Sequence, residues 1–236
     1  MATKKDLKTY FSYIRDDVGN NFKENEQINN KKVKYELCPS FNSKFKEIIE
    51  ERSTDIKIVI VGSFTPCKGR KNGYFYASQI NDKGEVTNGQ LKILQKCILF
   101  NKGNKRDFDV IIKCYKDLKN HDNKDSIIEE INKLLIKHNL IFQDIIDYAS
   151  SPYEEGYAND EYIKPYCLDK RTFERLYDDT KCIFICNSRF AEAALKKVLP
   201  QEARERISYC GQYNRHKSIE ERVEYFNNLI REKVSH

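Results

Sequence analysis

The chain has 236 residues, and its length, composition and charge exclude several classes of protein. Hydrophobic residues make up 39% of it and charged residues 33%, which places it in the globular range rather than among wholly disordered chains. Its longest apolar runs, such as residues 56–62, are too short to span a bilayer, and its first residues lack the apolar stretch of a secretory signal. We therefore expect a cytoplasmic, monomeric protein with no membrane partner, folded as one domain over residues 1–236.

The net charge of +6 is modest, but the basic residues are unevenly placed. Residues 56–81 carry four basic side chains and no acid, and residues 206–219 carry three and no acid. Acid-free basic stretches on an otherwise balanced chain favour a polyanionic partner such as nucleic acid. The alternative is that these stretches are simply solvated faces.

The eight cysteines are scattered, and none forms a C-x-x-C pair. Without a secretory signal, this usage predicts reduced thiols rather than disulfides. A zinc or iron–sulfur site would need cysteines to meet in space, and the spacing does not indicate it. We expect no metal and no cofactor.

The first part of the chain predicts helices followed by a buried strand. Residues 1–55 contain helical stretches near 3–16 and 43–52, separated by an Asn/Lys-rich segment, and predict an N-terminal helical extension. The continuous apolar run 56–62 is typical of a strand covered on both faces. Residues 101–123 are polar, and we expect a loop or a short helix there.

The second part alternates strands and helices. The apolar spacing within 127–135 and 219–230 predicts two helices. A third helix is expected over 188–199, with Ser188 as its N-cap. Residues 148–168 are expected to be irregular. Strands are expected at 140–147, 182–186 and 206–210.

This alternation predicts an α/β fold, a three-layer α/β/α sandwich around a short, mainly parallel central sheet. In such sheets, ligands bind beyond the carboxyl ends of the strands. The segment after the first strand, residues 62–76, combines small residues, three cations and several aromatic rings. It matches neither a P-loop nor a dinucleotide-binding fingerprint. It can hold a phosphate and a base, or it can be a plain connection with incidental lysines.

Two pieces of this segment read GSFTP at 62–66 and GYFYASQIN at 73–81. They resemble the first motif of the uracil-DNA glycosylase superfamily, and most closely its hypoxanthine and mismatch-specific branch. Later segments fall in the order that the family would place them. They are LIFQDIID at 140–147, Asn159-Asp160, CIFICNSRFAEAAL at 182–195 and SYCGQYNRHKSIEERVEYF at 208–226. The resemblance covers a family-like core over residues 56–232.

The chain departs from the family pattern at several positions. Thr65 precedes Pro66 where relatives have Pro-Gly, and Asn81 is followed by Asp82-Lys83 instead of Phe-Trp. The second motif lacks its usual Pro-Ser-Pro or His-Pro-Ser. Phe64 stands where many relatives place a water-binding Asp or Asn. These changes leave open which base the protein takes.

The resemblance implies a monofunctional DNA glycosylase. Such an enzyme flips a base out of DNA, hydrolyses its N-glycosidic bond through an oxocarbenium-like sugar and leaves an abasic site. Uracil, hypoxanthine and a bulky modified pyrimidine, as occurs in phage DNA, all remain candidates. The role would accordingly be base-excision repair or antiviral defence.

The resemblance also assigns residues to roles. For catalysis it favours Asn81 as the residue that positions the water, with His216 donating to the leaving base or contacting a phosphate. Asp144 or Asp147 would replace Asn81 if needed. The base pocket is expected to contain Ser63, Phe64, Phe75 and Asn187. The structural alternatives are a turn for Asn81, core packing for Phe75, a helix cap for Asn187, simple exposure for His216, and capping or salt bridging for Asp144 and Asp147. The expected DNA-binding residues are Lys68, Arg70, Lys71, Gln212, Asn214, Arg215 and Lys217.

Two other functions remain open. The chain could be a nucleic-acid-binding module that kept the fold without catalysis. It could also be a nucleotide-binding α/β enzyme of another class, since this fold class hosts many chemistries.

Overall fold

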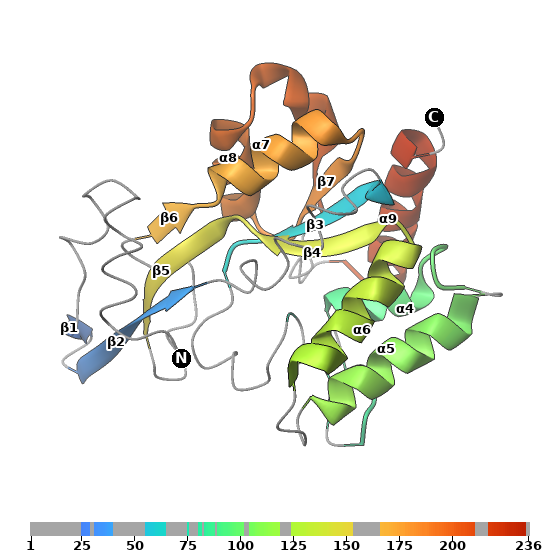
Figure 1. Cartoon of the computed structure of the whole chain (residues 1–236), viewed down its shortest axis with the longest axis horizontal. Helices are drawn as coiled ribbons and strands as arrows, with labels where there is room; N and C mark the ends of the chain where they lie inside the picture. Colours follow the sequence, from blue (N-terminus) through green and yellow to red (C-terminus); the bar gives the residue numbers. More distant parts are fainter. Residues whose placement is uncertain are drawn as a thin grey trace.

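The protein is built on two four-stranded sheets joined by one extended stretch of chain (Figure 1). The computed structural model describes residues 25–28, 31–39, 55–64, 75, 80–81, 83–87, 89–101, 104–118, 124–152, 166–210 and 217–234. The predicted helices at 3–16 and 43–52 lie outside these residues.

The central sheet is parallel and has the order β4-β3-β7-β8. Its strands are β3 (Ile58–Gly62), β4 (Leu140–Asp144), β7 (Ile183–Cys186) and β8 (Ile207–Tyr209). The predicted strands at 56–62, 182–186 and 206–210 are therefore confirmed. Residues 58–61 and 183–186 are buried throughout, because helices cover both faces of the sheet.

Helices on the two sides of this sheet complete the three layers (Figure 1), which confirms the expected α/β sandwich. One side carries α7 (Lys170–Asp179) and α8 (Arg189–Val198). The other side carries α4 (Gln90–Lys96), α5 (Lys105–Asp117) and α6 (Lys124–Lys137). The last helix, α9 (Ile219–Val234), packs against α4, and Asn227 Oδ1 accepts a hydrogen bond of 2.9 Å from the backbone of Ile98.

The second sheet is antiparallel, with the order β1-β2-β5-β6. Its strands are β1 (Asn25–Ile28), β2 (Lys31–Pro39), β5 (Ile146–Pro152) and β6 (Tyr166–Leu168). Only Ile145 separates β4 from β5, so residues 140–147, expected to be one strand, belong to two sheets. The strands at 25–28 and 31–39 were not predicted, although Val33, Tyr35 and Leu37 alternate with Lys34 and Glu36 in the pattern of a strand.

Helix α5 is longer than the loop or short helix expected for residues 101–123. Its buried side chains are Phe108, Ile111, Cys114 and Tyr115, which recur at helical spacing between lysines and aspartates. The end of α6 is fixed to α5 by Asp107, whose Oδ2 lies 2.9 Å from Nε2 of His138 and 2.8 Å from Nζ of Lys137. The hydrogen bond from Lys137, followed by that from His138, lowers the pKa of the Asp107 carboxyl.

Side chains cap the helices that begin or end near the central sheet. Ser188 is the N-cap of α8, as predicted, and its Oγ accepts a hydrogen bond of 3.0 Å from Ala191 N. Ser218 and Glu221 form a capping box at α9, with bonds of 3.1 and 2.6 Å. At the C-terminal end of α7, Arg206 donates to the carbonyl oxygens of Tyr177 and Thr180 at 3.2 and 2.9 Å.

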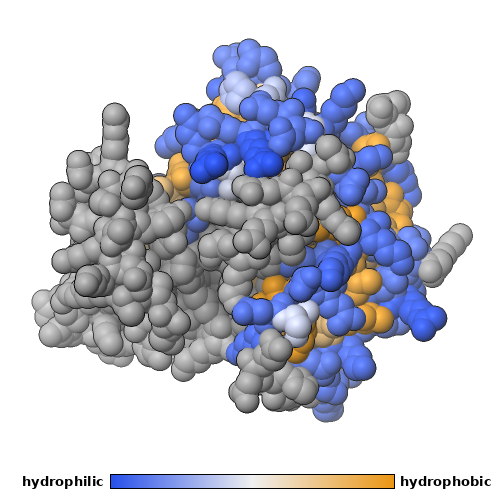
Figure 2. All heavy atoms as spheres, viewed as in Figure 1, coloured by the Kyte–Doolittle hydropathy of each residue, from blue (hydrophilic) through white to orange (hydrophobic). Residues whose placement is uncertain are grey.

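Hydrophilic residues cover most of the described part of the face drawn in Figure 2, with hydrophobic residues in smaller groups between them. This is the surface expected when amphipathic helices turn their apolar stripes towards the sheet. Among the described residues, no helix combines the length and apolar character needed to cross a membrane.

Candidate functional site

The strand order defines where a ligand should bind. The chain passes from β3 to β4 on one side of the sheet, and from β7 to β8 on the other side. The order therefore reverses between β3 and β7, and such a switch point forms a crevice beyond the carboxyl ends of the two strands. Ser63 and Phe64 follow β3 there, and Asn187 and Ser188 follow β7.

A buried carboxylate and a buried amide stand on either side of a glycine at this edge. Gly62 of β3 pairs with Asp144 of β4, and Asn187 continues the β7 ladder by donating its backbone N–H to Val61 O at 2.9 Å. By strand alternation, Asp144 and Asn187 project from the same face on the two sides of Gly62, which has no side chain. Their Cα atoms are about 10 Å apart, since neighbouring strands are about 4.8 Å apart. Each side chain is only 3% exposed.

The loop after β3 is hydrogen-bonded to the junction between the two sheets. The backbone N–H groups of Ile145 and Ile146 donate to the carbonyl oxygens of Gly62 and Ser63 at 2.9 and 3.1 Å. Asp147, the second predicted carboxylate, is buried one residue further along in β5. The structure thus brings Ser63, Asp144 and Asn187 to one edge, as the sequence indicated.

Asn81 lies in a tight turn. Its Oδ1 accepts from the backbone N–H of Glu85 at 2.8 Å, and its Nδ2 donates to Glu85 Oε2 at 2.9 Å. The backbone N–H of Gly84 also donates to the carbonyl oxygen of Asn81, at 2.9 Å. This is the turn role given above as the structural alternative, and a role in holding water stays a prediction.

The two phenylalanines expected in the base pocket are buried in the core. The ring centroid of Phe75 lies 6.1 Å from that of Phe142, which is two residues before Asp144 on the same face of β4. Phe64 directly follows the switch-point residue Ser63 and is also buried. Phe75 thus packs beneath the edge, and stacking of either ring on a base stays a prediction.

A cavity of about 400 Å³ adjoins this edge beyond the carboxyl end of β8. It lies between the first turns of α8 and α9 and the residues that end β8. Its lining consists of Arg189, Glu192, Tyr209, Cys210, Lys217, Arg222 and Tyr225. Three of these side chains are cationic and one is acidic, so the cavity is basic. We call it the basic cavity.

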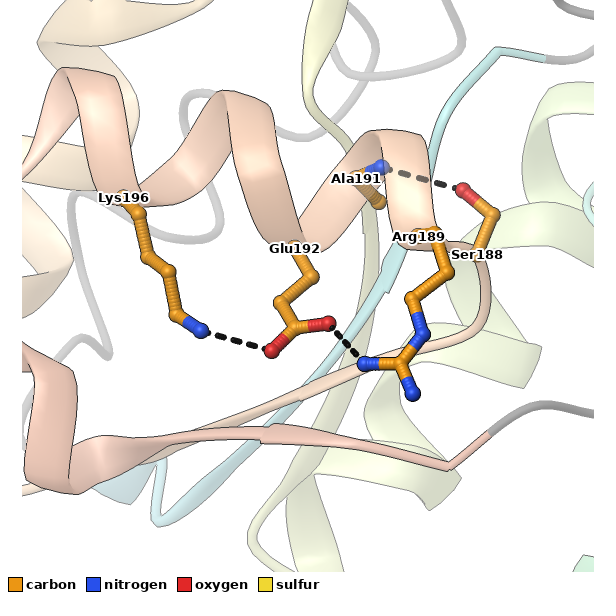
Figure 3. A network of polar contacts seen from close by, with 5 residues as sticks. All are labelled: Ser188, Arg189, Ala191, Glu192 and Lys196. Carbon is orange, nitrogen blue, oxygen red and sulfur yellow. Dashed lines mark hydrogen bonds and ion pairs between the residues drawn. The ribbon is translucent and has the colours of Figure 1, made fainter.

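The α8 wall of the basic cavity is an ion-pair network (Figure 3). Glu192 accepts from Arg189 Nη1 at 2.7 Å and from Lys196 Nζ at 2.6 Å. Burial raises the pKa of the Glu192 carboxyl, but the bonds from Lys196 and Arg189 outweigh it, so the pKa is lowered overall. The Arg189 guanidinium also lies 3.9 Å from the centroid of the Tyr209 ring.

The α9 wall adds two cations and an aromatic ring. Lys217 Nζ lies 5.6 Å from the ring centroid of Tyr225, and Arg222 Nε donates to Ser218 O at 3.4 Å. Burial raises the pKa of the Cys210 thiol to about 11, with Arg222 and Lys217 opposing it. The thiol is therefore protonated at neutral pH and is a poor nucleophile.

Of the predicted DNA-binding residues, the structure describes Lys217, which lines the basic cavity and is exposed. The catalytic candidate His216 lies outside the described residues. So do Lys68, Arg70, Lys71, Gln212, Asn214 and Arg215. Sequence reasoning missed Arg189, Arg222 and Tyr225. One signal was present: Ser218, Arg222 and Tyr225 recur at i, i+4 and i+7, on one face of the predicted helix.

The protein is thus an α/β protein with buried polar side chains at its switch point and a ligand-sized basic cavity beyond β8. Comparisons with protein-family models, curated proteins and solved structures found no match. Within the described part of the chain, no group of three or more His, Cys, Asp or Glu residues is placed to hold a metal ion. Cys97, Cys114, Cys182, Cys186 and Cys210 form no disulfide.

Proposed function

We propose that the protein is a monofunctional DNA glycosylase that hydrolyses the N-glycosidic bond of a base flipped to the carboxyl edge of the central sheet. The observation that supports this most is the pair of Asp144 and Asn187, buried on either side of Gly62 at the switch point. The resemblance of residues 56–232 to the uracil-DNA glycosylase superfamily suggests the same chemistry independently.

The two side chains suit different parts of the reaction. A carboxylate at Asp144 can hold the attacking water, accept its proton and stabilise the cationic sugar. The water oxygen bonds to C1′ while the glycosidic bond breaks and its electron pair leaves with the base. The amide of Asn187 can hydrogen-bond the edge of that base. Gly62 between them adds no side chain that would block a nucleotide.

Asp144 replaces Asn81 as our first candidate for the residue that holds the water. Asn81 holds its turn together through two side-chain bonds with Glu85. Asp144 already lies at the end of a buried strand that fixes its position. His216 remains a proposed contact to the leaving base.

Single-turnover excision tests this assignment. Duplexes containing uracil, hypoxanthine or modified phage pyrimidines would be scored for alkali-labile abasic sites. We expect Asp144→Asn to lower the rate by about 10²-fold or more, as for other positioned catalytic groups. The matched control is Asp178→Asn, an exposed position on α7, which should act like the wild type. Asn81→Ala with near-normal excision would support Asp144, whereas a 10²-fold loss would return the role to Asn81.

A nucleic-acid-binding module without catalysis is the second candidate. The basic cavity favours it, and so does Phe64 at the position where many relatives carry a water-binding residue. Salt-dependent DNA binding by a folded wild type that releases no base from any duplex would support this module. Binding of a free nucleotide without affinity for DNA would favour an enzyme of another class.

A further inference from the structure

We infer that the basic cavity binds a phosphodiester group of the nucleic-acid strand, next to the nucleotide that lies across Gly62. The inference rests on the proposed function in taking DNA as the strand, but it does not require that a base be cleaved. None of the residues that the resemblance assigned lies on the α8 wall of this cavity.

The charges of the lining favour a phosphate. Arg189, Lys217 and Arg222 supply three positive charges against the single negative charge of Glu192. Arginine carries five N–H donors in a planar fork that matches phosphate oxygens. The bond from Arg189 to Glu192 uses Nη1 and holds the side chain in place, so the guanidinium keeps donors for an anion. Its side chain is 73% exposed and can be reached from solvent.

The aromatic rings indicate a nucleotide rather than an isolated anion. Tyr209 lies under Arg189, and Tyr225 lies near Lys217. Tyr225 is 40% exposed and is the one exposed large hydrophobic side chain in the part of the chain that the structure describes. Cations beside tyrosine rings are a common way to hold a phosphate together with its sugar or base. A volume of about 400 Å³ has room for both.

The position of the basic cavity links it to the switch point. Asn187 stands at the edge, Ser188 caps α8, and Arg189 is the next residue. The backbone N–H of Cys210 donates to Cys186 O at 2.9 Å, so the end of β8 stays in register with β7. When one nucleotide of a DNA strand lies between Asp144 and Asn187, the neighbouring phosphate of that strand therefore lies at the cavity. The N-terminal ends of α8 and α9 add positive potential there.

The test compares two double variants that remove equal charge. Arg189→Gln with Lys217→Gln removes two exposed cations from the basic cavity. Lys181→Gln with Lys197→Gln removes two exposed cations outside its lining. Lys181 precedes β7 at the amino end of the sheet, and Lys197 is in the last turn of α8. The readout is fluorescence anisotropy of a labelled ten-nucleotide single strand across a salt series, with thermal unfolding to confirm folding.

We expect the cavity variant to weaken strand binding about tenfold or more and to reduce the salt slope by about one to two units. The control variant should stay within about twofold of the wild type in moderate salt, where distant charges are screened. Equal effects of the two variants, or no effect of either, would overturn the inference. If the cavity variant fails to fold, Tyr225→Ala with the same readout replaces it, and unchanged strand binding would then overturn the inference.

Two competition experiments distinguish a phosphate of the DNA strand from a free phosphate or nucleotide. Inorganic phosphate and a deoxynucleoside 5′-monophosphate are titrated as competitors of the labelled strand. Weak competition in the millimolar range supports a strand phosphate. A different result would assign the cavity to a free nucleotide and overturn the inference. In that case the monophosphate would bind tightly only when Arg189 is present, whereas strand binding would not change when Arg189 is replaced. Strand binding that depends on Arg189 without base release would contradict the proposed catalysis and leave the inference standing.

Discussion

Glu192 gives the sharpest test of the electrostatics of the basic cavity, because its replacement should have opposite effects on binding and on stability. Of the described residues that line the cavity, it is the only acid. Glu192→Gln keeps an acceptor for Arg189 and Lys196 but raises the net charge of the lining from two positive charges to three. An added positive charge should strengthen the binding of a phosphate.

The size of the effect follows from distances. Arg189 Nη1 lies 2.7 Å from Glu192. A phosphate on the far edge of the guanidinium would then lie roughly 6 to 7 Å from the carboxylate, since each hydrogen bond spans about 2.9 Å. With the dielectric of bulk water, about 80, Coulomb's law gives about 0.6 kcal/mol, or about threefold in Kd, as the lower limit of the effect. The gain should fall below about twofold at 0.5 M salt, where screening shortens the range of the charge.

Stability should change in the other direction. Glu192→Gln removes the charge from two partly exposed ion pairs, worth about 0.5 to 1 kcal/mol together, which is about 2 °C in Tm for a chain of this size. Because the Glu192 pKa is lowered by folding, this contribution is present above the ordinary value of 4.5 and is lost as pH falls through the folded value. Strand binding by anisotropy and Tm by calorimetry check the pair of effects. Unchanged or weaker strand binding at low salt would contradict the location of the phosphate.

Three further outcomes concern the scaffold. Arg206→Met should lower the free energy of unfolding by about 2 kcal/mol in urea titrations, because the carbonyl of Thr180 at the end of α7 loses a charged donor; a change under 0.5 kcal/mol would show that water replaces the arginine. Asp107→Asn should cost about 1 kcal/mol at pH 7 through its bonds to His138 and Lys137. Since the Asp107 pKa is lowered by folding, the cost should disappear as pH falls from the ordinary value of 3.8 through the folded value; a constant difference across that range would exclude the ionised pair. Ser218→Ala should lower Tm by about 2 to 4 °C through loss of the capping box, and Ser218→Thr should restore most of it.

The parallel sheet could be predicted because its strands are buried on both faces. Residues 58–61 and 183–186 have no exposed side to carry polar residues, so the sequence shows unbroken apolar runs. The strand at 31–39 has no such pattern. Its Val33, Tyr35 and Leu37 alternate with charged residues, which is a local signal for a strand. Its partner β5 lies more than a hundred residues away, so the sequence holds no local signal for the pairing itself. Helix α5 did carry a signal, since Phe108, Ile111 and Tyr115 recur at helical spacing, and the prediction of a loop or short helix followed only the polar composition of residues 101–123.

The candidate site, like the fold, could be predicted where the signal is local and not where it depends on distant contacts. Asp144 and Asn187 were identified from their position at strand ends, and the register of the sheet places them on either side of Gly62. Asn81 was chosen from a motif, whereas its contacts depend on Glu85, four residues later in the same turn. The basic cavity combines Arg189 with Arg222, and the distance between their segments is set by how α8 and α9 pack. Local charge patterns in the sequence do not contain that information.

The pairing of β2 with β5 has a consequence for how the protein is made and handled. The segment from 31 to 39 leaves the ribosome well before its partner at 146–152, which follows only after β3, the helices α4 to α6 and β4 have been synthesised. Until β5 arrives, β2 has an unpaired edge that can be occupied by another copy. A fragment beginning at residue 56 would leave the reciprocal edge of β5 open, and open edges promote aggregation and strand exchange between molecules. Any expressed fragment should therefore retain the N-terminal strands, even though the family-like segment begins after them.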